Sequence, residues 1–354
     1  MLCRILSGRQ ARAKDDDVDT DALPLAAGPD TARPRRSGAG ASIGDVPAPP
    51  DEAFTVLAAD GYPIRGSIWH GEAHGPVVVV HAATAVLARY YARFAAWLAG
   101  RGATVLTFDY RGIGQSRSTP LRALDAGWAA WGALDAEAVL AYALERWPGR
   151  ALMAVGHSIG GFAIGLAPSS VRLEAIVTVG AQFAYWRDYA PRSRRAMVLK
   201  WHLFMPAVTA ILGYFPGARL GWLEDVPRGV VRDWSRMGPR FEASLETALD
   251  RAELSRRHSA TRARLLAIGI SDDPFATDAA IARLLAYYSG ADRTHLRLAP
   301  GDVGTAEIGH FAFFHGRFSQ SLWPLAGDWL IEGRLAGDAP GRIVSRSERR
   351  AGGA

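Results

Sequence analysis

Residues 151–160 read ALMAVGHSIG, and this stretch decides the fold. Its first half, 151–155, is an apolar run of the kind that forms a buried strand in a parallel sheet. Its second half has the pattern Gly-x-Ser-x-Gly with Ser158 at the centre. In this pattern the chain turns sharply from a strand into a helix, and small residues on both sides of the serine avoid clashes. We therefore expect Ser158 at the carboxyl end of a strand, as a candidate nucleophile.

The five-residue pattern is weak by itself, because the chain contains 38 glycines. The alternative is a Gly-rich tight turn without a chemical role. The context favours the nucleophile, since an apolar strand precedes the pattern and residues 161–165, GFAIG, suit the start of a helix. The first N–H groups of such a helix would point toward the serine and favour a developing oxyanion.

Strand and helix patterns alternate on both sides of this stretch. Strands are predicted at 54–57, 64–69, 76–81, 104–108, 175–179, 265–270 and 295–298, and helices at 88–98, 136–146, 277–288 and 319–330. Asp60 and Gly61 separate the first two strands and are typical of a hairpin turn. The alternation favours a mostly parallel sheet covered by helices on both faces, with the hairpin as an antiparallel edge.

Two regions depart from the alternation. Residues 182–258 are rich in aromatic residues and arginine and show no buried strand pattern, which predicts an inserted helical cap. Residues 1–50 and 333–354 lack a hydrophobic period and are predicted to be disordered. The ordered domain is therefore expected at 51–332.

A serine needs a base to remove its proton, and in this arrangement the order along the chain is serine, acid, histidine. His310 lies between the last predicted strand and the last predicted helix, directly after Gly309. His295 and His315 are the alternatives; the first lies inside a predicted strand. His310 is therefore the candidate general base.

Two acids follow the strand predicted at 265–270. Asp273 precedes Pro274 and is the candidate that orients the histidine, with Asp272 as the alternative. Either carboxylate could instead cap its own turn.

An oxyanion needs two N–H donors. One is expected from Ile159, directly after the serine, and the other from the loop after strand 76–81. We choose Ala83 there, with Ala82 as the alternative, while the Thr84 hydroxyl is more often a local cap.

Three further residues are expected to have a structural role. Asp109 and Arg111 are expected to pair and hold the turn at 108–116, and Asp135 is a candidate N-cap of the helix at 136–146.

Together these segments resemble the α/β-hydrolases, and within them a group of bacterial serine hydrolases of undefined substrate. The resemblance rests on the blocks 81–85, 89–95, 108–116, 156–161, 271–275 and 308–314. It implies an α/β-hydrolase fold, with a mostly parallel central sheet, helices on both faces and an inserted helical cap. It does not specify a substrate. Many relatives have glycine where this chain has Ala82.

Composition narrows the class of protein further. Hydrophobic residues make up 49% and charged residues 21%, as in globular domains. The net charge of +6 comes from scattered arginines without a nucleic-acid reading motif, so no nucleic-acid partner is expected. Cys3 is the single cysteine, which fits a cytoplasmic protein without disulfides. The apolar stretch 201–216 is short and contains prolines, so no membrane span is expected.

The leading hypothesis is hydrolysis of a carboxylic ester or thioester through an acyl-enzyme, without cofactor or metal. The stretch 201–215 is expected to line a pocket for an apolar acyl group. The same triad would serve an acyltransferase, or an aminopeptidase or amidase that holds a substrate amine with Glu224, Asp225 or Glu242. A non-catalytic binding protein is the alternative of another class, and the presence of all three triad residue types argues against it. The oligomeric state is left open.

Overall fold

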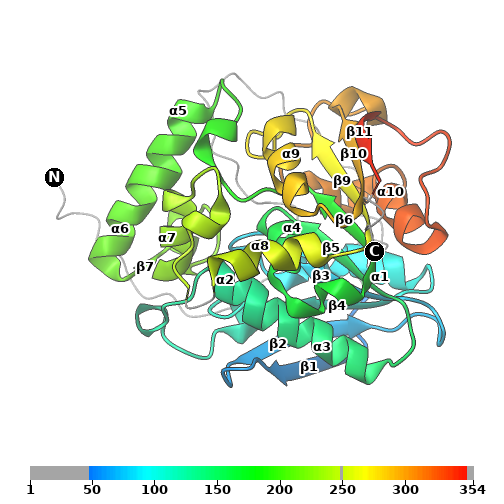
Figure 1. The fold of residues 1–354 in the computed structure, drawn as a ribbon, viewed down its shortest axis with the longest axis horizontal. Helices are drawn as coiled ribbons and strands as arrows, with labels where there is room; N and C mark the ends of the chain where they lie inside the picture. The colour runs from blue at the N-terminus through cyan, green and yellow to red at the C-terminus, as the bar shows by residue number, and fades with distance from the viewer. Residues whose placement is uncertain (1–47, 248–249, 349–354) are drawn as a thin grey trace, which may run out of the picture.

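The computed structural model describes residues 48–247 and 250–348. These residues form a nine-stranded sheet with the order β1-β2-β4-β3-β5-β6-β9-β10-β11 (Figure 1). The strands are β1 (Glu52–Leu57), β2 (Pro63–Trp69), β3 (Val77–His81), β4 (Thr104–Phe108), β5 (Leu152–His157), β6 (Leu173–Val179), β9 (Arg264–Ile270), β10 (Asp292–Leu298) and β11 (Arg342–Ser347). All strands from β4 to β10 in this order pair in parallel, while β1, β2 and β11 are antiparallel to their neighbours.

Helices cover both faces of the sheet (Figure 1). On one face, α1 (Ala92–Ala99) and α10 (Trp323–Gly327) pack together through edge-to-face contacts of Phe94 and Trp97 with Trp323. On the other face lie α3 (Glu137–Arg146), α4 (Ile159–Leu166), α8 (Arg251–Ala260) and α9 (Asp278–Tyr287). Every residue of β3, β4 and β5 is buried, which explains why these strands read as continuous apolar runs rather than alternating patterns. The predicted fold class is confirmed.

The C-terminal edge strand was not predicted. Residues 342–347, assigned to a disordered tail, form β11 and pair antiparallel with β10. The prediction is wrong there because all six side chains of β11 are exposed and carry no hydrophobic alternation. Main-chain hydrogen bonds hold the strand, and composition does not report them. Of the predicted disordered segment at 1–50, residues 1–47 lie outside the described residues.

A mostly helical insertion separates β6 from β9. It contains α5 (Arg194–Met197), α6 (Met205–Leu212), α7 (Arg228–Arg236) and a two-residue pair of strands, β7 (Tyr214–Phe215) and β8 (Val226–Pro227). In Figure 1 these elements stand to one side of the sheet as a cap. The predicted range 182–258 also includes most of α8, which packs on α4 and covers the sheet: His258 contacts Phe162 there. The cap therefore ends before α8.

A buried arginine fixes the turn after β4. Arg111 Nε donates to Asp135 Oδ1 at 2.6 Å, and its Nη1 donates to Asp60 Oδ2 at 2.5 Å. The side chain of Asp135 is fully buried and also accepts the N–H of Arg111 at 2.9 Å. Asp109 does not pair with Arg111; it accepts the N–H groups of Ala88 and Gln115 instead. The predicted Asp109–Arg111 pair and the predicted N-cap role of Asp135 are both wrong. The carboxylate of Asp135 binds the guanidinium of Arg111 instead, although the two residues are 24 positions apart in the sequence.

Removing the guanidinium of Arg111 should lower the free energy of unfolding. Arg111→Met leaves the Asp135 carboxylate buried without its cation, so we expect a loss of about 3–5 kcal/mol of unfolding free energy in urea titrations. The control is Arg117→Met, which removes an exposed arginine paired with Asp225 and should cost less than about 1 kcal/mol. Equal effects of the two substitutions would contradict this account.

Another carboxylate ties the cap to the core. Asp233 of α7 is buried, and its Oδ2 accepts the N–H of Trp128 at 2.7 Å, at the start of α2 (Trp128–Ala130). A Cβ atom at Gly127 would collide with this carboxylate, so the close approach requires glycine. Burial raises the pKa of Asp233 to about 7, although the Trp128 N–H acts in the opposite direction.

This raised pKa makes the cap anchor sensitive to pH. The unfolded chain loses the Asp233 proton near pH 4 and the folded chain only near pH 7, so ionisation costs stability as the pH rises through this window. Asp233→Asn removes the cost. Relative to wild type, the variant should gain about 2 kcal/mol of unfolding free energy between pH 5 and pH 8. A difference that does not change with pH would contradict the assignment.

Candidate active site

The segment around Ser158 forms the expected strand–turn–helix. β5 ends at His157, α4 begins at Ile159, and Ser158 lies between them with φ 54° and ψ −121°. Positive φ is strained for any residue with a Cβ atom and costs on the order of 1–3 kcal/mol. A Cβ atom at Gly156 would meet the backbone of Gly161, and one at Gly160 would collide with the carbonyl of His81. Both glycines of the pattern are therefore required by close backbone approach.

The histidine and one of the two acids meet beside this turn. Nδ1 of His310 lies 2.6 Å from Oδ2 of Asp273, and both side chains are buried. The other oxygen of Asp273 accepts the N–H groups of Phe275 at 2.8 Å and Ala276 at 3.1 Å. Because the carboxylate accepts a hydrogen bond from Nδ1–H, the neutral ring has its unprotonated nitrogen at Nε2, which is the atom a general base uses.

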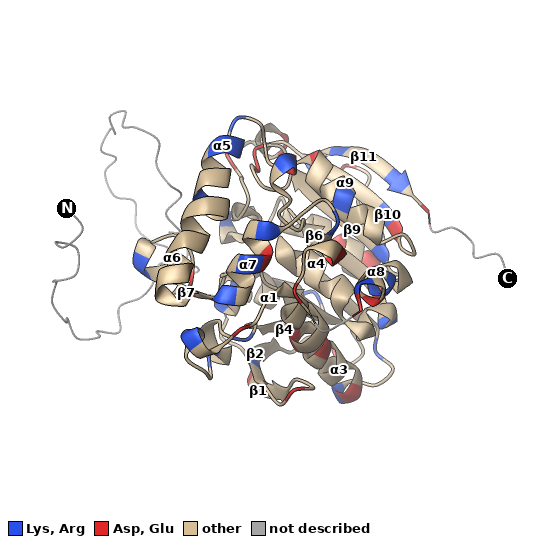
Figure 2. Cartoon of the chain, turned by 60° about the vertical axis from the view of Figure 1, so that its left-hand side comes forward, with Lys and Arg blue, Asp and Glu red and all other residues tan. Residues whose placement is uncertain are grey.

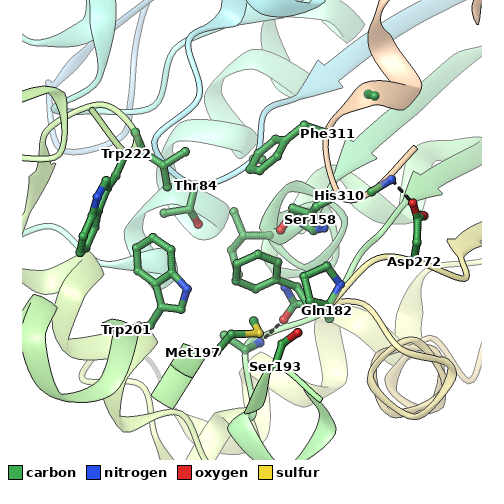
Figure 3. Close-up of a pocket in the computed structure, with 18 of the residues that line it drawn as sticks. Thr84, Ser158, Gln182, Ser193, Met197, Trp201, Trp222, Asp272, His310 and Phe311 are labelled. Atoms are coloured by element: carbon green, nitrogen blue, oxygen red, sulfur yellow. Dashed lines mark hydrogen bonds between the residues drawn. The ribbon is translucent and has the colours of Figure 1, made fainter. Parts of the chain in front are cut away.

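The second acid has a different position. The carboxylate of Asp272 accepts the N–H groups of Ile308 and Gly309, each at 3.0 Å (Figure 3). Asp272 therefore holds the loop that carries His310, while Asp273 contacts the ring itself. Of the alternative histidines, His295 is buried in β10, and His315 lines the same cavity as Ser158 but packs edge-on against Tyr90.

A buried hydrogen-bond chain behind the serine was missed by the sequence analysis. The N–H of Ala83 donates to Tyr91 Oη at 2.9 Å, and Tyr91 Oη lies 2.8 Å from His157 Nδ1. His157 Nε2 lies 2.8 Å from the carbonyl oxygen of His310. Since a carbonyl oxygen only accepts hydrogen bonds, Nε2 of His157 carries the ring proton and donates it to that carbonyl, while Nδ1 accepts a hydrogen bond from the Tyr91 hydroxyl. Burial lowers the pKa of His157 well below its usual value, so the ring stays neutral.

These hydrogen bonds change which residues can donate to the oxyanion. Ala83 was chosen as the second donor, but its N–H is engaged by Tyr91. Ala82, the alternative, does not line the pocket, whereas Thr84 and Ile159 do. Ile159 is the first residue of α4, so its N–H has no acceptor within the helix.

Ser158 and His310 open into a cavity of about 730 Å³ between the sheet and the cap. Its cap wall includes Met197, Trp201 and Trp222, which Figure 3 shows on the side away from Asp272. Trp201 stacks on Trp234 with ring centroids 4.7 Å apart. The cap stretch expected to line an apolar pocket thus contributes Trp201. Across 48–247 and 250–348, no helix has the length and apolar character to cross a bilayer.

The acidic residues considered for amine binding lie away from this cavity. Asp225 accepts the N–H of Ala218 and pairs with Arg117, and Glu242 accepts the hydroxyl of Tyr287. Neither they nor Glu224 line the cavity; the carboxylates that do are Asp272, which the loop N–H groups engage, and the exposed Glu307.

Comparisons with known proteins agree with this fold. Residues 71–236 match the family described as serine aminopeptidase, S33. The structure of DcsB with its substrate analogue has a TM-score of 0.56 at 14% identity, over 81% of this chain and 99% of DcsB. An esterase of Pyrococcus furiosus has a TM-score of 0.50 at 13% identity, over 80% of this chain and 93% of the esterase. The chain has the α/β-hydrolase fold.

A puromycin hydrolase is a further solved structure with a similar fold. It has a TM-score of 0.51 at 16% identity, and the similarity spans 84% of this chain but only 41% of that one. No curated protein sequence matches the chain significantly. These proteins are described as an aminopeptidase family, an esterase and a puromycin hydrolase. The similarities therefore establish the α/β-hydrolase fold but do not distinguish ester from amide substrates.

The positions of the two acids lead to a comparison of variants. Asp273→Asn should reduce the rate of Ser158 labelling by a fluorophosphonate on the order of 10³- to 10⁴-fold, because an amide favours the wrong tautomer of His310. Asp272→Asn keeps that contact and weakens only the loop, so we expect a reduction of about tenfold or less. The reverse order of effects would assign the acid to Asp272.

Proposed function

We propose that this chain is a serine hydrolase that cleaves a carboxylic ester or thioester through an acyl-enzyme. Ser158 is the nucleophile, His310 the general base and Asp273 the acid that orients it. The observation that carries the proposal is the 2.6 Å contact between His310 and Asp273, since His310 lines the same cavity as the strained serine. An acyl substrate with an apolar part suits the tryptophans of the cavity wall.

The reaction follows from these positions. Ser158 Oγ attacks the carbonyl carbon while His310 Nε2 takes its proton, and the carbonyl oxygen becomes an oxyanion. The N–H of Ile159 and the hydroxyl of Thr84 donate to that oxyanion in this proposal, since both residues line the cavity. The intermediate collapses to an acyl-enzyme, and His310 returns the proton to the leaving group. A water molecule, deprotonated by His310, then attacks the acyl-enzyme and releases the acid and the free serine.

The aminopeptidase reading uses the same three residues and has the support of the family match at 71–236. It requires a carboxylate that binds the free amine of the substrate. The cavity offers Asp272, which already accepts two N–H groups, and Glu307 on the exposed rim. The absence of a free carboxylate deep in the cavity, among the residues described, favours the ester or thioester. Transfer of the acyl group to an acceptor other than water would use the same acyl-enzyme.

A paired substrate panel tests the proposal. We expect the folded enzyme to hydrolyse 4-nitrophenyl butyrate and butyryl thioesters at least tenfold faster, in kcat/KM, than alanyl and leucyl arylamides. The expected loss on Ser158→Ala and on His310→Ala is at least about 10³-fold. Turnover of arylamides with a free amine in preference to the esters would replace this proposal by the aminopeptidase. A folded protein that turns over neither class would favour the binding-protein alternative.

A further inference from the structure

Many basic residues of the described chain lie on the outside of the molecule, and several of the arginines pair with carboxylates. Figure 2 shows them spread over several elements, including α5, α7 and β11, with acidic residues between them. Arg232, for example, pairs with Asp125 and Glu246, and Arg283 with Asp188. Lys200 lies in a different setting, in the wall of the cavity.

Lys200 belongs to the cap and lines the cavity that contains Ser158 and His310. Its Nζ lies 3.9 Å from the ring centroid of Trp222 and 4.5 Å from that of Trp201. The two rings face each other edge-to-face, with centroids 5.7 Å apart. An ammonium over two tryptophan faces is held in place by attraction to their π electrons.

The environment of Lys200 lacks a negative charge. Within the described residues, no carboxylate lies within 4 Å of its Nζ, and the side chain is only partly exposed. Desolvation by burial lowers the pKa of Lys200 below its usual value. A partly desolvated cation without a counter-ion is unfavourable, and an anion that enters the cavity would remove that cost.

The other charges around the cavity do not compensate for this cation. Arg192 and Arg317 are exposed residues that also line it, and Asp272 has both oxygens engaged by loop N–H groups. Glu307 is exposed. The cap side of the cavity therefore presents a cation together with aromatic faces, which is the opposite of what a substrate amine requires.

We propose that Lys200 binds an anionic group, a carboxylate in the simplest case, at the end of the substrate remote from the scissile bond. This inference rests on the proposed function and names the substrate class of the same site: an acyl ester or thioester with an apolar chain that ends in a carboxylate. The chain packs against Trp201 and Trp222, and the carboxylate accepts hydrogen bonds from the ammonium. Lys200 is thus a specificity-determining residue.

The test compares charged and neutral esters of equal length. The first series consists of 4-nitrophenyl monoesters of succinate, glutarate and adipate against their methyl-capped counterparts. A second pair, 4-carboxyphenyl and phenyl butyrate, places the anion on the alcohol side. Wild type should prefer at least one member of the first series over its capped counterpart about 10- to 100-fold in kcat/KM, the size of one charge-assisted hydrogen bond.

Three variants separate the charge from packing. Lys200→Met keeps the stem on the tryptophans and should abolish the preference, measured as the ratio of kcat/KM for each charged ester to that for its capped counterpart. Lys200→Arg should retain it. Arg187→Met is the matched control, since Arg187 lies over Trp186, 5.2 Å from the ring centroid, outside the cavity lining. Equal turnover of charged and capped esters by wild type, or a preference confined to the alcohol side, would overturn the assignment of an acyl-chain carboxylate.

A binding measurement tests the role of Lys200 even if the enzyme hydrolyses none of these esters. Quenching of tryptophan fluorescence in Ser158→Ala by monomethyl adipate should occur at concentrations at least tenfold lower than by dimethyl adipate, and Lys200→Met should equalise them. Binding with this preference but without turnover of any ester would contradict the proposed hydrolase activity while supporting Lys200. Turnover of esters with equal binding of the two ligands would contradict the role of Lys200 alone.

Discussion

The strained backbone of Ser158 is the constraint on which the rest of the site depends. A serine with φ 54° between β5 and α4 stays there only if its surroundings leave no relaxed alternative. Gly156 and Gly160 allow the backbone of α4 and the end of β3 to approach closely enough to enforce this conformation. The result is a side chain placed at the carboxyl edge of the sheet, where the first N–H groups of α4 face the same space. The glycines, the parallel strands and the chemistry of the serine are therefore one structural requirement.

The residues around the serine form two hydrogen-bonded layers. In the front layer, Asp273 sets the proton position of His310. In the layer behind, Tyr91 and His157 join the loop after β3 to the main chain of His310 through contacts of 2.8–2.9 Å. Because His157 is neutral and fully buried, this second layer adds no charge near the base. Three loops that are distant in sequence are thus held in register by one tyrosine and one histidine.

Periodicity and motif predicted the parallel sheet, the serine turn and the place of His310, because each has a local signal: a continuous apolar run, a glycine pair or a position after the last strand. Contacts that join distant segments had no such signal. Arg111 reaches Asp135 rather than Asp109, and the N–H of Ala83 meets Tyr91 rather than the cavity. Tyr91 lies inside a block that resembles the family, and His157 occupies a variable position of the serine motif. The sequence therefore indicated no role for either residue. β11 was not predicted because main-chain pairing, rather than a buried apolar face, holds this strand.

The central claim is that the turn after β5 presents an activated serine. The most direct measurement is peptide mapping by mass spectrometry after reaction of the folded protein with a fluorophosphonate. The account predicts one adduct per chain, on the peptide that contains Ser158, and none after heat denaturation. An adduct on another residue, or no adduct on a folded protein with an open cavity, would contradict it.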